Sequence, residues 1–340
     1  MHSLDIIYRD LKPENVLIRL CGSQLIDPSP LYGTYGLLSE YDDVRVTTLR
    51  IIKSWLLAIA NVVPLQMPTP EVANTLALRL LISQCDENKA CSETAIEVWN
   101  AWIALSGKDG GLSAGSWIAP LLELVNSGPG PRRERAARAL AIGTKLHKID
   151  SKSALTAAIN LYENNGPPEV TMANGRKVER PDEGIPTRRA AAEGLRSLSA
   201  THVLENDDAA LYVLKFVCTI GAIDRDESVR ELMVSAGKSL LDSYAKDIPK
   251  LLEFLQTEMQ RKAKNGEDLE SFDYRHEAVV ILLGAAGKYC PPDATEVVAS
   301  IVTSLVEALN TPSEVVQIAV ADCIVPLVQR RKTAEIKQPL

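Results

Sequence analysis

The sequence predicts an all-α protein in which pairs of helices follow one another in series. Three observations support this fold class. Hydrophobic residues make up 46% of the 340 residues but aromatic residues only 5%, which suits helix-on-helix packing better than a β-sandwich or barrel. Apolar residues recur at helical spacing along most of the chain. Similar segments also return at a near-constant interval.

The helical spacing starts at about residue 42. Apolar residues there recur every three to five positions, at Val44, Leu49, Ile52, Leu56, Ile59 and Val63. A second helix is expected to start with Thr69 as N-cap and Pro70 at the first helical position. The same device recurs at Thr311 and Pro312, where Glu314 completes a capping box by reaching back to the Thr311 amide.

The helical segments recur with a period of their own. Candidate second helices start near Arg133, Arg188, Val229, Arg275 and Val315, which are 55, 41, 46 and 40 residues apart. A period of about 40 to 47 residues with two helices per unit is typical of HEAT repeats. We therefore expect a HEAT/armadillo-like α-solenoid of about six helix pairs over residues 42–331, after a short irregular segment (1–36) and before a tail (332–340). An ordinary all-α globule is the alternative.

One long polar segment interrupts this pattern. Residues 165–185 are rich in Gly, Pro and charged side chains. Loops of that length inside a repeat array are usually functional or disordered, so we expect a flexible loop.

The composition excludes several classes of protein. No apolar run approaches the roughly 20 residues that a membrane-spanning helix requires, and the first residues lack the apolar stretch of a signal peptide. Six scattered cysteines and four lone histidines show no metal-binding spacing. We expect reduced thiols in an intracellular protein, with no metal site and no cofactor.

The first residues carry a motif of a different kind. Residues 8–15, Tyr-Arg-Asp-Leu-Lys-Pro-Glu-Asn, resemble the catalytic loop of serine/threonine protein kinases, closest to the cyclic-nucleotide-dependent group because Tyr8 stands where His is usual. The resemblance implies that Asp10 accepts the proton of the substrate hydroxyl. It also implies that Lys12 lies near the transferred phosphoryl group and that Asn15 holds a magnesium ion.

The sequence around this loop does not supply the rest of a kinase. Only nine residues precede Asp10, too few for a Gly-rich phosphate loop, an ATP-pairing Lys and its Glu partner. Where Asp-Phe-Gly is expected, residues 25–28 read Leu-Ile-Asp-Pro. Phosphoryl transfer depends on positioning and on charge neutralisation by metal and cationic groups. We therefore expect an inactive kinase remnant or a fusion scar; an active kinase fragment and a docking role are the alternatives.

Basic residues are concentrated in one part of an acidic chain. The formal net charge is −7, which argues against a general nucleic-acid-binding surface. Residues 131–189 nevertheless contain 12 Lys and Arg against 7 Asp and Glu, a net charge of +5, so the remainder carries −12. Two interpretations remain open: arginines at aligned helix starts form a ridge that faces phosphates, or they lie on a solvated helix face with local ion pairs. The candidates for ribosome or RNA binding are Arg132, Arg133, Arg135, Arg138, Arg176, Lys177, Arg180, Arg188 and Arg189.

The C-terminal part resembles a known family. Residues 275–288 read Arg-His-Glu-Ala-Val-Val-Ile-Leu-Leu-Gly-Ala-Ala-Gly-Lys, and residues 307–317 read Glu-Ala-Leu-Asn-Thr-Pro-Ser-Glu-Val-Val-Gln. These segments, continued through residue 328, are similar to the general control nonderepressible protein one family of very large HEAT-repeat translational activators. The similarity is best over 270–330, extends from about 42, and does not include residues 1 to about 35.

The resemblance implies a non-enzymatic scaffold associated with cytoplasmic ribosomes. Such a scaffold promotes activation of the initiation factor two alpha kinase under amino-acid starvation, and its kinase-docking region lies outside this chain. The implied partners are the ribosome, translation-control proteins and ribosomal RNA. A protein kinase fragment and a generic HEAT adaptor are the alternative functions, because fold alone does not fix function.

Overall fold

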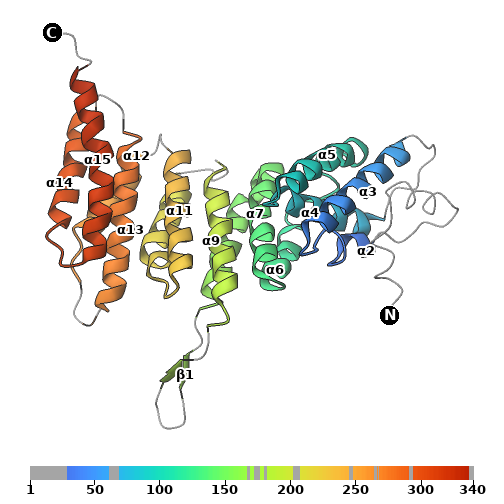
Figure 1. Ribbon diagram of the computed structural model, residues 1–340, viewed down its shortest axis with the longest axis horizontal. Helices are drawn as coiled ribbons and strands as arrows, with labels where there is room; N and C mark the ends of the chain where they lie inside the picture. Colours follow the sequence, from blue (N-terminus) through green and yellow to red (C-terminus); the bar gives the residue numbers. More distant parts are fainter. Residues whose placement is uncertain are drawn as a thin grey trace. The chain divides into compact units, whose positions relative to one another are not determined.

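The structure is a computed structural model (Figure 1). It describes residues 29–60, 69–166, 169–171, 177–179, 182–201, 207–244, 248–263, 266, 268–290 and 294–336. The described residues are helical almost throughout, which confirms the all-α fold class. The kinase-like motif, with Asp10, Lys12 and Asn15, lies outside the described residues.

The chain divides into two compact units, Met1–Asp150 and Ser151–Leu340. In the first unit, α4 and α5 and then α6 and α7 form helix pairs that follow α2 and α3. The elements of this unit are α2 (Ser29–Tyr32), α3 (Asp42–Ala60), α4 (Pro70–Gln84), α5 (Lys89–Ser106), α6 (Ile118–Asn126), α7 (Gly130–Leu146) and the 3-10 helix η1 (Lys148–Asp150).

The second unit contains four helix pairs and one short hairpin. Its helices are α8 (Ser151–Glu163), α9 (Ile185–Ser199), α10 (Asp207–Thr219), α11 (Glu227–Ser243), α12 (Ile248–Met259), α13 (Leu269–Gly287), α14 (Thr295–Ala308) and α15 (Glu314–Ile336), with η2 (Gly221–Ile223) before α11. The described residues thus contain six successive pairs from α4 to α15, as the periodicity predicted. The second helices of these pairs begin 41, 55, 42, 42 and 45 residues apart.

Small residues set how closely the helices approach one another. In the second unit, a Cβ added to Gly237 of α11 would lie 2.7 Å from Leu282 of α13, and one added to Gly284 of α13 would lie 2.5 Å from Cys323 of α15. In the first unit, a Cβ at Gly143 would lie 2.4 Å from the ring of Trp117. Glycine at these positions lets neighbouring helices pack at a distance that any larger side chain would increase.

The predicted flexible loop contains regular structure. Within it, β1 (Glu169–Thr171) pairs antiparallel with β2 (Lys177–Glu179), and Val170 lies opposite Val178. Strands of only three residues give little alternation for a sequence pattern to detect. Figure 1 shows this hairpin projecting from the helices between α8 and α9.

Two predicted boundaries in the last helix pair need correction. The Thr311 amide donates to the Ala308 carbonyl at 3.0 Å, so it is not the amide that Glu314 caps, and α15 begins at Glu314 itself. The helix then continues to Ile336, into the predicted tail. No helix within the described residues has the length and hydropathy of a membrane-spanning segment.

Candidate functional site

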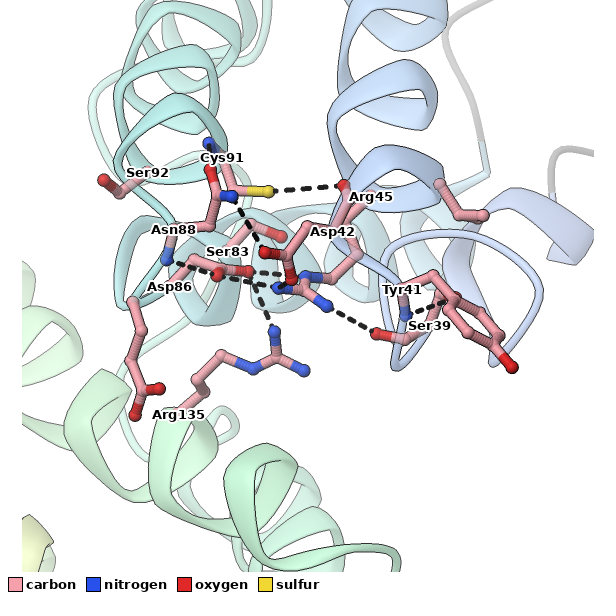
Figure 2. A network of polar contacts seen from close by, with 12 residues as sticks. Ser39, Tyr41, Asp42, Arg45, Ser83, Asp86, Asn88, Cys91, Ser92 and Arg135 are labelled. Carbon is pink, nitrogen blue, oxygen red and sulfur yellow. Dashed lines mark hydrogen bonds and ion pairs between the residues drawn. The ribbon is translucent and has the colours of Figure 1, made fainter.

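The most extensive polar network of the first unit is centred on Asp86 (Figure 2). Asp86 lies in the turn between α4 and α5, two residues before Asn88. Its Oδ1 accepts the Asn88 backbone N–H at 3.0 Å, and the Asn88 side chain caps α5 by accepting the Cys91 N–H at 3.2 Å. These contacts within the turn set the direction of the Asp86 carboxylate.

Arg45 of α3 binds this carboxylate with a bidentate geometry. Its Nε donates to Asp86 Oδ2 at 2.6 Å and its Nη2 donates to Oδ1 at 2.9 Å. The remaining donors reach the carbonyls of Ser39 and Glu40, each at 3.0 Å, and Asp42 Oδ1 at 2.6 Å. All five N–H donors of this buried guanidinium are therefore used.

Arg135 of α7 approaches the same carboxylate from another helix. Its Nη1 donates to Asp86 Oδ2 at 2.8 Å, and its side chain is only 7% exposed. Figure 2 shows that a single nitrogen of this guanidinium reaches Asp86. Asp86 thus connects α3, the α4–α5 turn and α7, and it is shared by two buried arginines.

The second unit contains a corresponding network centred on Asp224. Asp224 precedes Asp226, the N-cap of α11, and its Oδ1 accepts the Asp226 N–H at 2.9 Å. Arg188 of α9 binds Asp224 with the same bidentate geometry, from Nε at 2.7 Å and from Nη2 at 3.0 Å. The Tyr162 hydroxyl donates to Asp224 Oδ2 at 2.7 Å. The spacing from Arg to Asp is 36 residues here and 41 residues in the first unit.

Arg188 also joins the two ends of the hairpin insertion. Its Nη1 donates to the Asn165 carbonyl and to Asp182 Oδ1, both at 2.9 Å, and its Nη2 donates to Asp182 Oδ2 at 2.7 Å. All five donors are again used, and the side chain is only 1% exposed. One buried guanidinium therefore holds the segment before β1, the segment after β2 and the start of α11.

The electrostatics of the two networks differ. Burial alone would raise the pKa of Asp86, but hydrogen bonds from Arg45 and Asn88 hold that pKa below its ordinary value. Burial alone would lower the pKa of Arg188, but its hydrogen bonds to Asp182 and Asp224 raise that pKa. In Arg135 the balance is reversed. Burial and the nearby charge of Arg45 lower its pKa, and Asp86 offsets only part of this effect.

The structure changes the interpretation of the predicted basic ridge. Arg135 and Arg188 are buried in ion pairs within the chain, so they are not exposed to phosphates as expected. Arg138 donates to Glu87 at 3.0 Å, and Arg133 Nε donates to the Gly128 carbonyl at 2.8 Å.

The other candidates lie in several settings. Arg132 and Arg189 are half-buried at the starts of α7 and α9. Arg176 and Arg180 lie outside the described residues, and Lys177 belongs to β2, where only the backbone is described.

Sequence reasoning missed the two aspartates that organise these networks. A detectable signal was present, because each Asp stands two residues before the N-cap of a second helix and 36 to 41 residues after an Arg. Among the described residues, no group of three or more His, Cys, Asp and Glu side chains is placed to hold a metal ion. Likewise, no disulfide joins the five cysteines of that part.

The repeats are similar to those of known proteins. A family model described as "Stalled ribosome sensor GCN1, HEAT repeats" matches residues 69–288. Protein ILITYHIA of Arabidopsis thaliana is 30% identical over 297 residues, which is 86% of this chain and 10% of that protein. The stalled ribosome sensor GCN1 of Homo sapiens is 28% identical over 58% of this chain and 7% of its own length.

A fungal relative also matches the chain. The eIF-2-alpha kinase activator GCN1 of Saccharomyces cerevisiae is 26% identical over 62% of this chain and 8% of its own length. The chain thus spans a tenth or less of the length of these three relatives. The family match covers more than half of the chain and includes both Asp86 and Asp224, so the chain belongs to the family of GCN1 HEAT-repeat proteins.

Proposed function

We propose that this chain is part of a non-catalytic scaffold that associates with cytoplasmic ribosomes and acts in translational control. The observation that carries the proposal is the family match over residues 69–288. The human relative is named a stalled ribosome sensor and the yeast relative an eIF-2-alpha kinase activator. By analogy, the partners are ribosomes and translation-control proteins, and kinase activation under amino-acid starvation proceeds through regions outside this chain.

Two partly exposed arginines are the proposed contacts with ribosomal RNA. They are Arg133 on α7 and Arg189 on α9, whereas Arg135 and Arg188 are committed to buried carboxylates. Each unit therefore offers its own basic position at the start of a second helix. Interactions between such residues and phosphates release counterions, which makes binding weaken as salt rises.

Sedimentation of purified ribosomes with the chain, across a salt series, tests this proposal. We expect co-sedimentation at low salt, and we expect Arg133→Glu with Arg189→Glu to weaken it. The salt dependence should fall by about one unit of slope for each interaction with a phosphate that the substitutions remove. Arg50→Glu with Lys152→Glu, at exposed positions of α3 and α8, is the matched control for the change in charge. No co-sedimentation by the wild-type chain would contradict the proposal, and an equal loss in the control would remove the two arginines from it.

The kinase-like motif supports a second candidate function. Residues 8–15 retain an Asp, a Lys and an Asn in the order of a kinase catalytic loop. Incubation with labelled ATP, magnesium and a basic substrate protein tests for phosphoryl transfer. Incorporation that Asp10→Ala abolishes would establish a kinase fragment. We expect no incorporation, because the motif lacks the surrounding groups that bind ATP and metal.

A further inference from the structure

A cavity in the first unit opens beside the Asp86 network. It has a volume of about 420 Å³ and is lined by the turn before α3, the α4–α5 turn and the start of α7. Arg45, Asp86 and Arg135 form its buried part. The side chains of Asp42 and Glu87, which also line it, are 53% and 65% exposed. The cavity therefore has a buried interior and an exposed acidic edge.

The interior contains hydrogen-bond donors that have no acceptor within the described part of the chain. Arg45 uses all five of its donors, but Arg135 has one hydrogen bond there, to Asp86, although the residue is only 6% exposed. The buried Nε atoms of Arg135 and of the neighbouring Arg132 have no partner among the described residues. A buried donor without an acceptor is unfavourable, and more so when it is charged. The Nε atoms are enclosed by protein, so an acceptor that enters the cavity would be stabilised by the Nη groups of these arginines.

The charge of the interior is positive. Arg45, Arg132 and Arg135 line the cavity, and Asp86 is the one buried carboxylate among its lining residues. The buried part of the cavity therefore has two guanidinium groups against one carboxylate, and the half-buried Arg132 lies beside it.

We propose that this cavity binds an Asp or Glu side chain of a partner protein, presented on a segment with Lys or Arg on either side. The partner carboxylate accepts hydrogen bonds from Arg132 and Arg135, which suits the planar fork of a guanidinium. The flanking basic residues lie against Glu40, Asp42 and Glu87 at the edge. A nucleic-acid backbone fits this pattern poorly, because the negative phosphates on either side of the bound one would face the acidic edge. The inference goes beyond the proposed function and uses neither Arg133 nor Arg189.

Fluorescence anisotropy with the whole chain at low ionic strength tests this proposal. The probes are the labelled peptide Lys-Lys-Ser-Glu-Ser-Lys-Lys, its Gln counterpart, its counterpart with every Lys replaced by Glu, and a short oligouridylate. We expect the first peptide to bind about tenfold more tightly than its Gln counterpart, the effect of one charge-assisted pair. The all-acidic peptide should also bind more weakly than the first.

Variants of the protein assign the binding to this cavity. Arg132→Gln should weaken binding of the first peptide about tenfold. Arg133→Gln is the matched control, since this neighbouring arginine does not line the cavity, and it should change affinity less than about twofold. Glu87→Gln should weaken the Lys-flanked peptide and strengthen the all-acidic one. If Arg132→Gln fails to fold by circular dichroism, Arg132→Lys, which keeps the charge but not the fork, should give a smaller loss in the same direction.

Several outcomes would overturn the inference. They are equal binding of the Glu and Gln peptides, no measurable binding of any peptide, or equal losses in the Arg132 and Arg133 variants. Tighter binding of oligouridylate that depends on Arg132 would assign the cavity to RNA instead. Weak or absent peptide binding leaves the ribosome co-sedimentation test unaffected, because that test changes Arg133 and Arg189 and not Arg132.

Discussion

The Asp86 and Asp224 networks both pair a buried aspartate with a buried arginine, but their further partners differ. Each Asp precedes a helix N-cap, and each binds an arginine that uses all five donors. Around Asp224 the further partner is the Tyr162 hydroxyl, which donates its one hydrogen to the carboxylate, so among the described residues no arginine beyond Arg188 is buried there. Around Asp86 the further partner is a second arginine with one hydrogen bond. The Asp224 network therefore contributes to stability alone. The Asp86 network leaves unused hydrogen-bond donors of Arg135 beside a cavity.

The largest expected difference between the two networks comes from removing one arginine from each. Arg188→Met should lower the free energy of unfolding by about 3–5 kcal/mol, because two carboxylates lose their common partner. Arg135→Met should lower it by about 1.5 kcal/mol or less, because Arg45 still binds Asp86 and an imperfectly satisfied charge is removed. Urea unfolding of both variants measures these changes. Equal effects would show that the two networks do not differ as their hydrogen bonds indicate.

A smaller effect is expected from the tyrosine that belongs to the second network. Tyr162→Phe removes the hydroxyl that donates to Asp224 Oδ2 and should lower the free energy of unfolding by about 1.5 kcal/mol, since the acceptor is charged. Tyr212→Phe, at an exposed position of α10, is the control and should be nearly neutral. A neutral result for Tyr162→Phe would mean that Asp224 gains nothing from its third partner.

The dependence of stability on pH provides a further test of the Asp86 network. The pKa of Asp86 lies below its ordinary value in the folded state. The stabilisation from its hydrogen bonds is therefore present above the unfolded pKa of about 3.9, and it is lost as pH falls through the folded pKa. Thermal unfolding between neutral pH and strong acid should show this loss in the wild type. Asp86→Asn should be less stable at neutral pH and should lose less on acidification; parallel curves would contradict the assignment.

The smallest effect is expected at the hairpin. Replacing residues 167–181 with a short Gly-Ser linker should change the free energy of unfolding by less than about 1 kcal/mol, because loop-closure entropy varies slowly with length. Arg188 continues to hold Asn165 and Asp182 in this variant. Asp182→Asn in the shortened chain weakens that connection and should cost more than the shortening itself. The reverse order would show that the strands stabilise the second unit.

The sequence predicted the helices better than it predicted the networks. Second helices were placed at 133, 188, 229, 275 and 315 and begin at 130, 185, 227, 269 and 314, because apolar periodicity and turn residues are local signals. The burial of Arg135 and Arg188 is not local, since it depends on carboxylates of other turns in the same unit. A charged residue in a polar position of a helical pattern is usually exposed. The pattern therefore predicted a surface where the structure has ion pairs.

The connection that Arg188 makes across the base of the hairpin has a practical consequence. The chain enters and leaves this excursion at two points held by a single side chain, so sequence inserted between β1 and β2 would leave this connection unchanged. Such a site is useful for inserting an epitope, a fluorophore-binding tag or a protease cleavage sequence. The connection between β1 and β2 is therefore the natural place in this chain to graft foreign sequence.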